Sequence, residues 1–124
     1  MAQGWRVLED DRLLDGSAAS ALLQTRVDQG LLTTYLQSDT GCLLTFVSNG
    51  ARAMIVLMER AGDPGQHAVS PGDAGSSGGY VLDNGQEDTY DDADTVPLAD
   101  ALADVRAIVD TGRPPREMRW AFDR

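Results

Sequence analysis

The clearest pattern of apolar and polar positions lies between Val96 and Phe122. Apolar residues there recur every three or four positions, which is the period of one helical face. These residues are Leu98, Ala101, Leu102, Val105, Ile108 and Val109. Pro97 suits a first helical turn, Gly112 suits a left-handed C-terminal cap, and Pro114 prevents the helix from resuming. The pattern therefore predicts one amphipathic helix that ends near Gly112.

A strand is predicted after the prolines, because side chains of two kinds alternate there. Met118, Trp120 and Phe122 fall on one face and Glu117, Arg119 and Ala121 on the other. We assign Trp120 to the core, since its alternation with two other apolar residues is typical of burial. The end of the chain thus reads as a core helix followed by a closing strand.

The first thirty residues predict a short strand over 4–8 and a helix over 17–29. Trp5 and Val7 would share one face of the strand. Asp15 or Ser17 can cap the helix and Gly30 can end it. Ala18, Leu22 and Val27 are the positions expected to face inward.

Three apolar runs at 31–37, 42–48 and 51–58 predict an antiparallel meander. Asn49-Gly50 between the second and third runs is a strong hairpin signal, because both residues tolerate positive φ. The third run is apolar on both faces, which predicts a central strand that is covered on each side. Its methionines, Met54 and Met58, fit core packing, with an adaptable binding surface as the alternative.

Residues 61–79 are rich in Gly, Pro, Ser and Asp and show no periodicity, which predicts a functional or mobile loop. Residues 80–82 and 86–90 flank Asn84-Gly85 and predict a second hairpin. These elements give an α+β fold in a single domain over residues 1–124. We expect a single antiparallel sheet, made of the central three-stranded meander, the short hairpin and the C-terminal strand, packed with two helices.

Charge narrows the choice of partner. The chain has 20 Asp and Glu residues against 10 basic residues, all of them Arg, for a net charge of -10 at pH 7. Nucleic acids and anionic membranes both attract cationic surfaces, so neither is expected as a partner, and a basic protein is favoured.

The single cysteine, Cys42, has no thiol to pair with, which favours a reducing compartment. The chain also shows neither a secretory signal pattern nor an apolar run long enough to span a membrane. We therefore expect a cytoplasmic protein.

An acidic run occupies residues 83–94, where six acids stand without a basic residue. One interpretation is a solvated hairpin tip and connection, and the other is a docking patch for a cationic protein. The spacing of these acids does not match an EF-hand calcium loop.

Residues that would support catalysis are sparse. His67 is the only histidine, and Cys42 lies in an apolar run far from any evident base. The Gly-rich segment lacks the GxxxxGK pattern of a phosphate-binding loop, and the chain has no Lys. The sequence therefore predicts a binding protein that is not an enzyme and has no catalytic residue, no metal and no cofactor.

Several short motifs lie between residues 70 and 120. They are Val96-Pro97 before an Ala-rich helix with Ala101 and Ala107, then Thr111-Gly112-Arg113-Pro114, and a strand closing on Trp120. Upstream are Ser70-Pro71-Gly72 and the stretch 79–85. Over residues 70–120 these motifs resemble the immunity protein 1 family of bacterial polymorphic toxin systems, in which a Ser-x-Gly loop and a short strand precede the helix.

This resemblance implies an antitoxin that binds and neutralises a cognate toxin, expected to be a nucleic-acid deaminase with a cationic cleft. Such an enzyme needs a zinc-activated water and a path for the nucleotide strand, which a bound acidic protein would block. From charge, we place the contact surface on Tyr80, Glu87, Asp88, Tyr90, Asp91, Asp92 and Asp94, with Asp73 as an addition. The alternative function is a small acidic intracellular adapter or chaperone-like protein for a basic partner.

Overall fold

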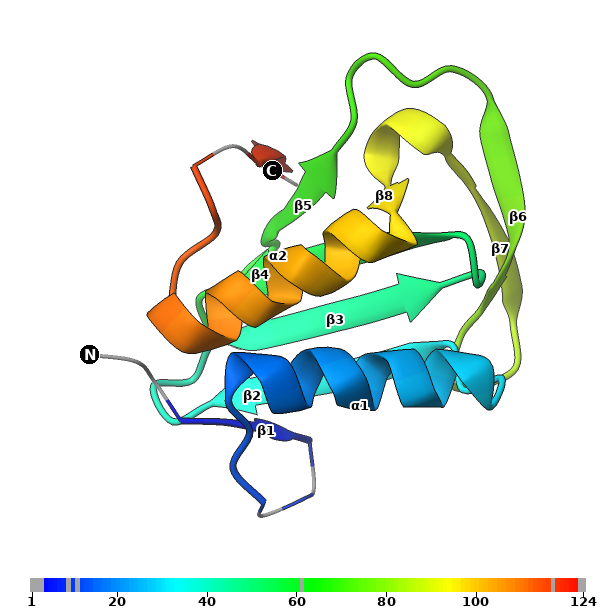
Figure 1. Ribbon diagram of the computed structural model, residues 1–124. Coiled ribbons are helices and arrows are strands. Elements are labelled where there is room, and N and C mark those ends of the chain that lie inside the picture. Colours follow the sequence, from blue (N-terminus) through cyan, green and yellow to red (C-terminus); the bar gives the residue numbers. More distant parts are fainter. Residues whose placement is uncertain (1–3, 9, 11, 61, 117, 123–124) are drawn as a thin grey trace.

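The computed structural model describes residues 4–8, 10, 12–60, 62–116 and 118–122 (Figure 1). The elements are β1 (Trp5–Val7), α1 (Gly16–Asp28), β2 (Thr33–Ser38), β3 (Leu43–Ser48), β4 (Arg52–Met58), β5 (Gln66–Val69), β6 (Ser76–Val81), β7 (Glu87–Asp91), the 3-10 turn η1 (Asp92–Asp94), β8 (Val96–Pro97), α2 (Leu98–Thr111) and β9 (Arg119–Phe122). The main sheet has the order β1-β2-β3-β4-β5-β9, with β8 also paired to β4. The predicted α+β class is confirmed.

The hairpin was expected in the main sheet but forms a sheet of its own. Strands β6 and β7 pair only with each other among the described strands, with an irregular register between Ser77 and Tyr80. Figure 1 shows this hairpin standing at the end of β3. A single sheet was therefore the wrong prediction, since the hairpin leaves the plane of the meander.

The predicted meander is present, with β2, β3 and β4 antiparallel and β4 inside the sheet. Its second turn depends on Asn49, whose side-chain oxygen accepts hydrogen bonds from the backbone N–H groups of Ala51 and Arg52 at 2.9 and 2.8 Å. Gly50 takes a φ of 90°. A residue with a Cβ would be strained in that conformation, which explains the Asn-Gly pair.

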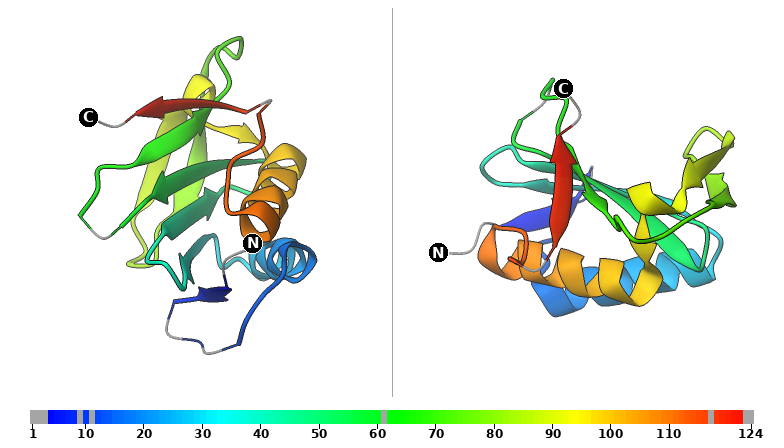
Figure 2. Two further views of the ribbon diagram at one scale, coloured as in Figure 1. Left: turned by 90° about the vertical axis from the view of Figure 1, so that its left-hand side faces the viewer. Right: turned by 90° about the horizontal axis from the view of Figure 1, so that it is seen from above.

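Both helices pack on the same face of the main sheet (Figure 2). Helix α2 buries Ala101, Val105, Ile108 and Val109, as its periodicity predicts, and it ends at Gly112 with a φ of 78°. Against these side chains lie the inward residues of the strands, among them Leu36, Leu44, Phe46, Ile55 and Ala68. This layer between helices and sheet is the hydrophobic core.

Helix α1 is present with Asp15 as its N-cap and Gly30 just beyond its last turn, but its buried face differs from the prediction. Gly16, Ala19 and Leu23 are buried and define the inner face of the helix, whereas Ala18, about 100° around the helix from Ala19, is exposed. Leu22 and Val27 are partly buried and pack against the core.

The other face of the main sheet is covered only in part. Thr33, Val47 and Met54 sit beside one another near the hairpin, where the Thr33 hydroxyl donates to the Val81 carbonyl at 2.8 Å. Farther along the strands, partly buried side chains line up in two rows. One row is Tyr35, Thr45, Val56, His67 and Ala121, and the other is Gln37, Leu43 and Met58. We call these eight residues the open face; beyond Gln37 the second row ends in Arg6 of β1, which forms an ion pair with Asp39. The prediction that β4 is covered on both sides is wrong.

Two predictions about the later part of the chain also change. The Gly-rich segment contains β5 and the start of β6, because four residues flanked by Gly and Pro are too few to show a period. Strand β9 pairs with β5 at the sheet edge, where Trp120 is partly buried against the core but Phe122 is 67% exposed. Phe122 is therefore not a core residue, and Glu117 lies outside the described residues.

Neither helix in the described part of the chain is long and apolar enough to cross a membrane.

Close contact between the two helices at Gly16 gives a stability prediction. The Cβ of Ala at this position would collide with the Arg106 carbonyl and the Asp110 carboxylate, which accepts a hydrogen bond from the Gly16 N–H at 2.7 Å. Ala normally favours a helix over Gly by about 1 kcal/mol, but here overpacking should cost about 1–3 kcal/mol. Urea unfolding should therefore show a lower unfolding free energy for Gly16→Ala than for the wild-type protein. The neighbouring exposed Ser17→Ala should change stability by less than about 0.5 kcal/mol; an equal or higher stability for Gly16→Ala would contradict the packing.

Candidate partner-binding surface

Negative charge is concentrated in residues 61–105, which we call the acidic segment. It contains no Arg or Lys and carries half of the 20 acidic residues of the chain. It forms β5, the hairpin, η1, β8 and the first half of α2, the green-to-orange part of the ribbon in Figure 1. Like charges brought together in this way repel one another, so a cation from elsewhere in the chain is needed to hold them.

That cation is Arg52, at the start of β4. Its Nε donates to the Thr95 hydroxyl at 2.8 Å, and its Nη2 lies 2.9 Å from the Asp92 carbonyl oxygen and 3.1 Å from the Thr95 carbonyl oxygen. The same Nη2 is 2.7 Å from the Asp73 carboxylate, and Nε is 3.7 Å from the Asp92 carboxylate. The planar guanidinium thus joins the loop before the hairpin to the connection after it, using the several fixed donors that Arg provides.

Hydrogen bonds from uncharged side-chain donors complete the attachment of the hairpin. The Ser77 hydroxyl donates to the Asp92 carboxylate at 2.6 Å, and the Ser70 hydroxyl donates to the Thr95 carbonyl at 2.7 Å. The Asn49 side-chain amide donates to the Gly78 carbonyl at 3.0 Å, which ties the hairpin to the β3–β4 turn. The hairpin is therefore fixed at both ends and along its first strand.

Two of the predicted contact acids, Asp73 and Asp92, serve this internal network. The Asp73 side chain is 42% exposed and the Asp92 side chain only 19%. Arg52 offsets one of these two negative charges, so the pair offers a partner less charge than two free carboxylates would.

Tyr80 was predicted to anchor a partner but is fully buried. It lies on the inner side of the hairpin, and its ring centroid is 4.7 Å from that of Tyr90. Burial raises the pKa of Tyr80, an effect that Thr95 and Arg52 partly offset. Tyr80 therefore holds the hairpin to the sheet, and its assignment to the contact surface is corrected.

Tyr90 and Asp88 lie on the same side of β7 and are partly exposed. The Tyr90 hydroxyl donates to one oxygen of Asp88 at 2.9 Å, and the Gln86 amide donates to the other oxygen at 2.7 Å. Burial, reinforced by the Asp88 hydrogen bond and its negative charge, raises the pKa of Tyr90 to about 12. These two predicted residues border the open face.

Asp94 also lies at the border of the open face, where it contacts His67. The Nε2 atom of His67 lies 3.1 Å from the Asp94 carboxylate, which joins β5 to η1. Both residues line a hollow of about 430 Å³ together with Met54, Val56, Pro64 and Tyr90. We call it the anchor groove; its floor is apolar and its rim is acidic, which suits a side chain with an apolar stem and a cationic end.

Glu87 and Asp91 are the predicted acids that point away from the sheet. They are exposed and alternate with Asp88 and Tyr90 along β7. Within the described part of the chain, their carboxylates form no hydrogen bond or ion pair. Their charge is therefore fully available to a partner.

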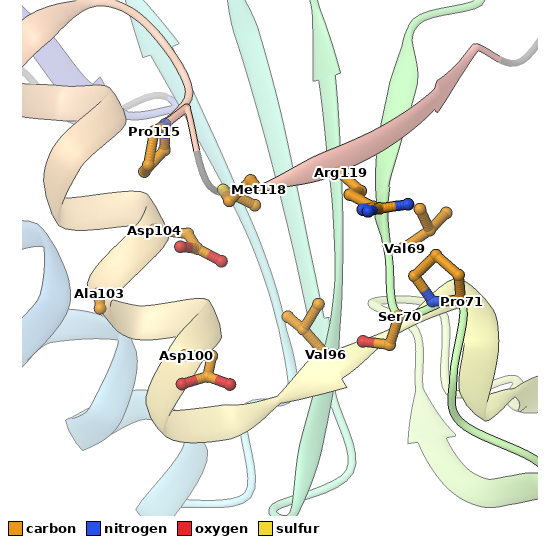
Figure 3. Close-up of a pocket in the computed structure, with 10 residues that line it drawn as sticks. All are labelled: Val69, Ser70, Pro71, Val96, Asp100, Ala103, Asp104, Pro115, Met118 and Arg119. Atoms are coloured by element: carbon orange, nitrogen blue, oxygen red, sulfur yellow. The ribbon is translucent and has the colours of Figure 1, made fainter.

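A second hollow of about 440 Å³ lies between α2 and the β5–β9 edge (Figure 3). Asp100 and Asp104, one helical turn apart, point into it from α2, and Arg119 lies on the opposite wall. Val69, Val96 and Met118 supply apolar lining. The Ser70 hydroxyl in this wall donates to the Thr95 carbonyl, so it is not paired with a base that could activate it as a nucleophile. The sequence analysis did not find this hollow, because its walls come from three separate segments of the chain.

Among the described residues, no three His, Cys, Asp or Glu side chains come together as a set of metal ligands. Comparison of the sequence with protein-family models and with curated proteins finds no match. The resemblance to immunity protein 1 therefore stays a prediction.

Replacement of Arg52 tests the internal network. Arg52→Ala leaves the carbonyls of Asp92 and Thr95 without their donor and removes the cation between two carboxylates, which should lower the unfolding free energy by about 2–4 kcal/mol. Proteolysis should become faster within residues 70–95. Asp73→Ala removes only the more exposed partner and should cost less than about 1 kcal/mol. Equal losses in the two variants, measured by urea unfolding, would refute the central role of Arg52.

The raised pKa of Tyr90 predicts a fall in stability at high pH. Tyr in the unfolded chain loses its proton near the ordinary value of 10.0, whereas Tyr90 in the folded protein keeps its proton to about 12. The unfolded state then binds fewer protons, so this contribution is complete below pH 10 and is lost as the pH rises from 10 to 12.

Tyr90→Phe should make the fall in unfolding free energy shallower over that interval, as measured by urea unfolding at several pH values. Some slope should persist, because the pKa values of Tyr35 and Tyr80 are also raised. An unchanged slope in Tyr90→Phe would contradict the environment described for this hydroxyl.

Proposed function

We propose that this protein is an immunity protein that binds a cognate toxin and blocks its substrate site, with a nucleic-acid deaminase as the expected toxin. The observation that supports this most is the acidic hairpin, whose outward carboxylates, Glu87 and Asp91, form no ion pair within the described part of the chain. A toxin that acts on nucleic acid needs a cationic path for its substrate, and the hairpin offers the opposite charge.

Charge of this kind acts mainly on the rate of encounter. Complementary potentials steer two proteins together and are screened by salt over about 10 Å at 0.1 M ionic strength. Fixing the hairpin in advance through Arg52 lowers the ordering cost of binding. The inhibitor then excludes the nucleic acid by occupying its path, and no chemical step by the inhibitor is required.

Co-expression gives a direct test of the function. The proposal predicts that a large secreted protein is encoded beside this gene, and the probe is the C-terminal domain of that protein, the expected toxin. Its expression should stop growth, and co-expression of this protein should restore growth and yield a co-purifying pair. Co-purification without rescue would favour the adapter function; failure of both rescue and binding would refute the immunity function.

Charge reversal of the hairpin should slow association. In the double variant Glu87→Arg/Asp91→Arg we expect the association rate constant for the inactive toxin domain to fall about tenfold or more at low salt, with a smaller difference at high salt. The matched control is Asp28→Arg/Glu59→Arg, which makes the same change in net charge outside the acidic segment. Stopped-flow mixing measures the association rate constant of both variants. If both associate equally slowly, the effect comes from net charge alone and the hairpin has no special role.

A further inference from the structure

We propose that the open face of the main sheet is the buried centre of the toxin interface, and that it receives an apolar segment of the toxin flanked by Arg or Lys. This inference rests on the proposed function and assigns a second, uncharged part to the binding surface. The acidic hairpin would steer the toxin, while the open face would hold it.

The composition of the open face supports a buried contact. Its residues Tyr35, Gln37, Leu43, Thr45, Val56, Met58, His67 and Ala121 include no Asp, Glu, Lys or Arg, although the chain as a whole is 24% charged. The charged neighbour at the end of the second row is Arg6, which pairs with Gln37 and forms an ion pair with Asp39 at 2.6 Å. All eight are partly buried side chains of strands, so they form a firm surface. Depletion of charged residues at the centre, with a polar rim, is the usual anatomy of a protein interface.

The position of the face in the fold leaves it accessible. Both helices cover the opposite side of the sheet. The hairpin lies over the row that contains Thr33, Val47 and Met54 and reaches only the edge of the open face, where Asp83 lies beside Tyr35 and Tyr90 beside Val56. The uncovered rows begin directly beside the anchor groove, which contains Val56 and His67 of the open face. A partner held at the hairpin would therefore also lie over the open face.

The rim of the face selects the partner by charge. Asp88 and Asp94 border it at the hairpin and at η1, and Asp83 shares a surface hollow with Tyr35 at the β2 side. The half-exposed Asp94 is within reach of a cationic group in the anchor groove, and the Tyr90 ring offers such a group a π-face. An Arg or Lys beside an apolar segment matches both the apolar floor and this rim.

A second copy of the chain is a poorer occupant of the same face. It would bring an equally acidic rim against the first, and each chain carries a net charge of -10. Like charges placed opposite one another in an interface cost several kcal/mol. The charge pattern therefore favours a basic partner over a homodimer.

Two substitutions of Thr45, which is central in its row, test the inference. If the open face is buried against the toxin, Thr45→Glu and Thr45→Arg should both raise the Kd for the inactive toxin domain at least tenfold, because either places a charge in the contact. If the face is only part of an electrostatic surface, Thr45→Arg should weaken binding and Thr45→Glu should not. That second result would overturn the inference.

The controls separate folding and overall charge from contact. Thr25→Glu and Thr25→Arg, on the exposed side of α1, should leave the Kd within about twofold of the wild-type value.

Val56→Thr is a further open-face variant that keeps the branched shape of the side chain. It should raise the Kd severalfold while the circular dichroism spectrum stays unchanged. Wild-type binding that is unaffected by every open-face variant overturns this inference alone, whereas absence of wild-type binding overturns the proposed function and the inference together.

Discussion

The guanidinium of Arg52 is the interaction on which the acidic half of the molecule depends. It lies in a segment of β4 that is fixed by the sheet, and it binds oxygens of Asp73, Asp92 and Thr95, which belong to the loop before the hairpin and the connection after it. A segment of 45 residues without one Arg or Lys would otherwise repel itself. One cation from outside the segment therefore fixes the hairpin and determines which carboxylates are ion-paired with it and which face outward.

The main sheet has two different sides. The side under α1 and α2 holds the core and gives the protein its stability, with Ile55 and Ile108 among its fully buried members. The middle of the other side, the open face, is uncharged, only partly buried and bordered by the acids of the hairpin and η1. In the proposed complex, the separate hairpin supplies steering by charge and the adjacent face of the main sheet supplies the uncharged contact.

The sequence was most informative where a signal is local. The period of α2, the cap at Gly112 and the Asn49-Gly50 turn each involve neighbours in the chain, and each prediction is confirmed. What failed depended on distant pairing: the separate hairpin, the burial of Tyr80, the exposure of Phe122 and the use of Asp92 by Arg52. Arg52 is 40 residues from Asp92 in the sequence, and nothing in the sequence around Arg52 indicates which carboxylate it will bind. The open face was not predicted because both alternating sets of β4 residues are apolar, and this pattern is typical of a strand that is buried on both sides.

The methyl groups of methionine offer the most direct measurement of the central claim, that the hairpin and the open face together bind the toxin. Met58 belongs to the open face and Met54 lines the anchor groove, whereas Met118 lines the hollow on the helix side. In a protein labelled at its methionine methyls, addition of the inactive toxin domain should shift the NMR signals of Met54 and Met58 and leave that of Met118 unchanged. A shift confined to Met118 would place the partner on the opposite side and contradict this account.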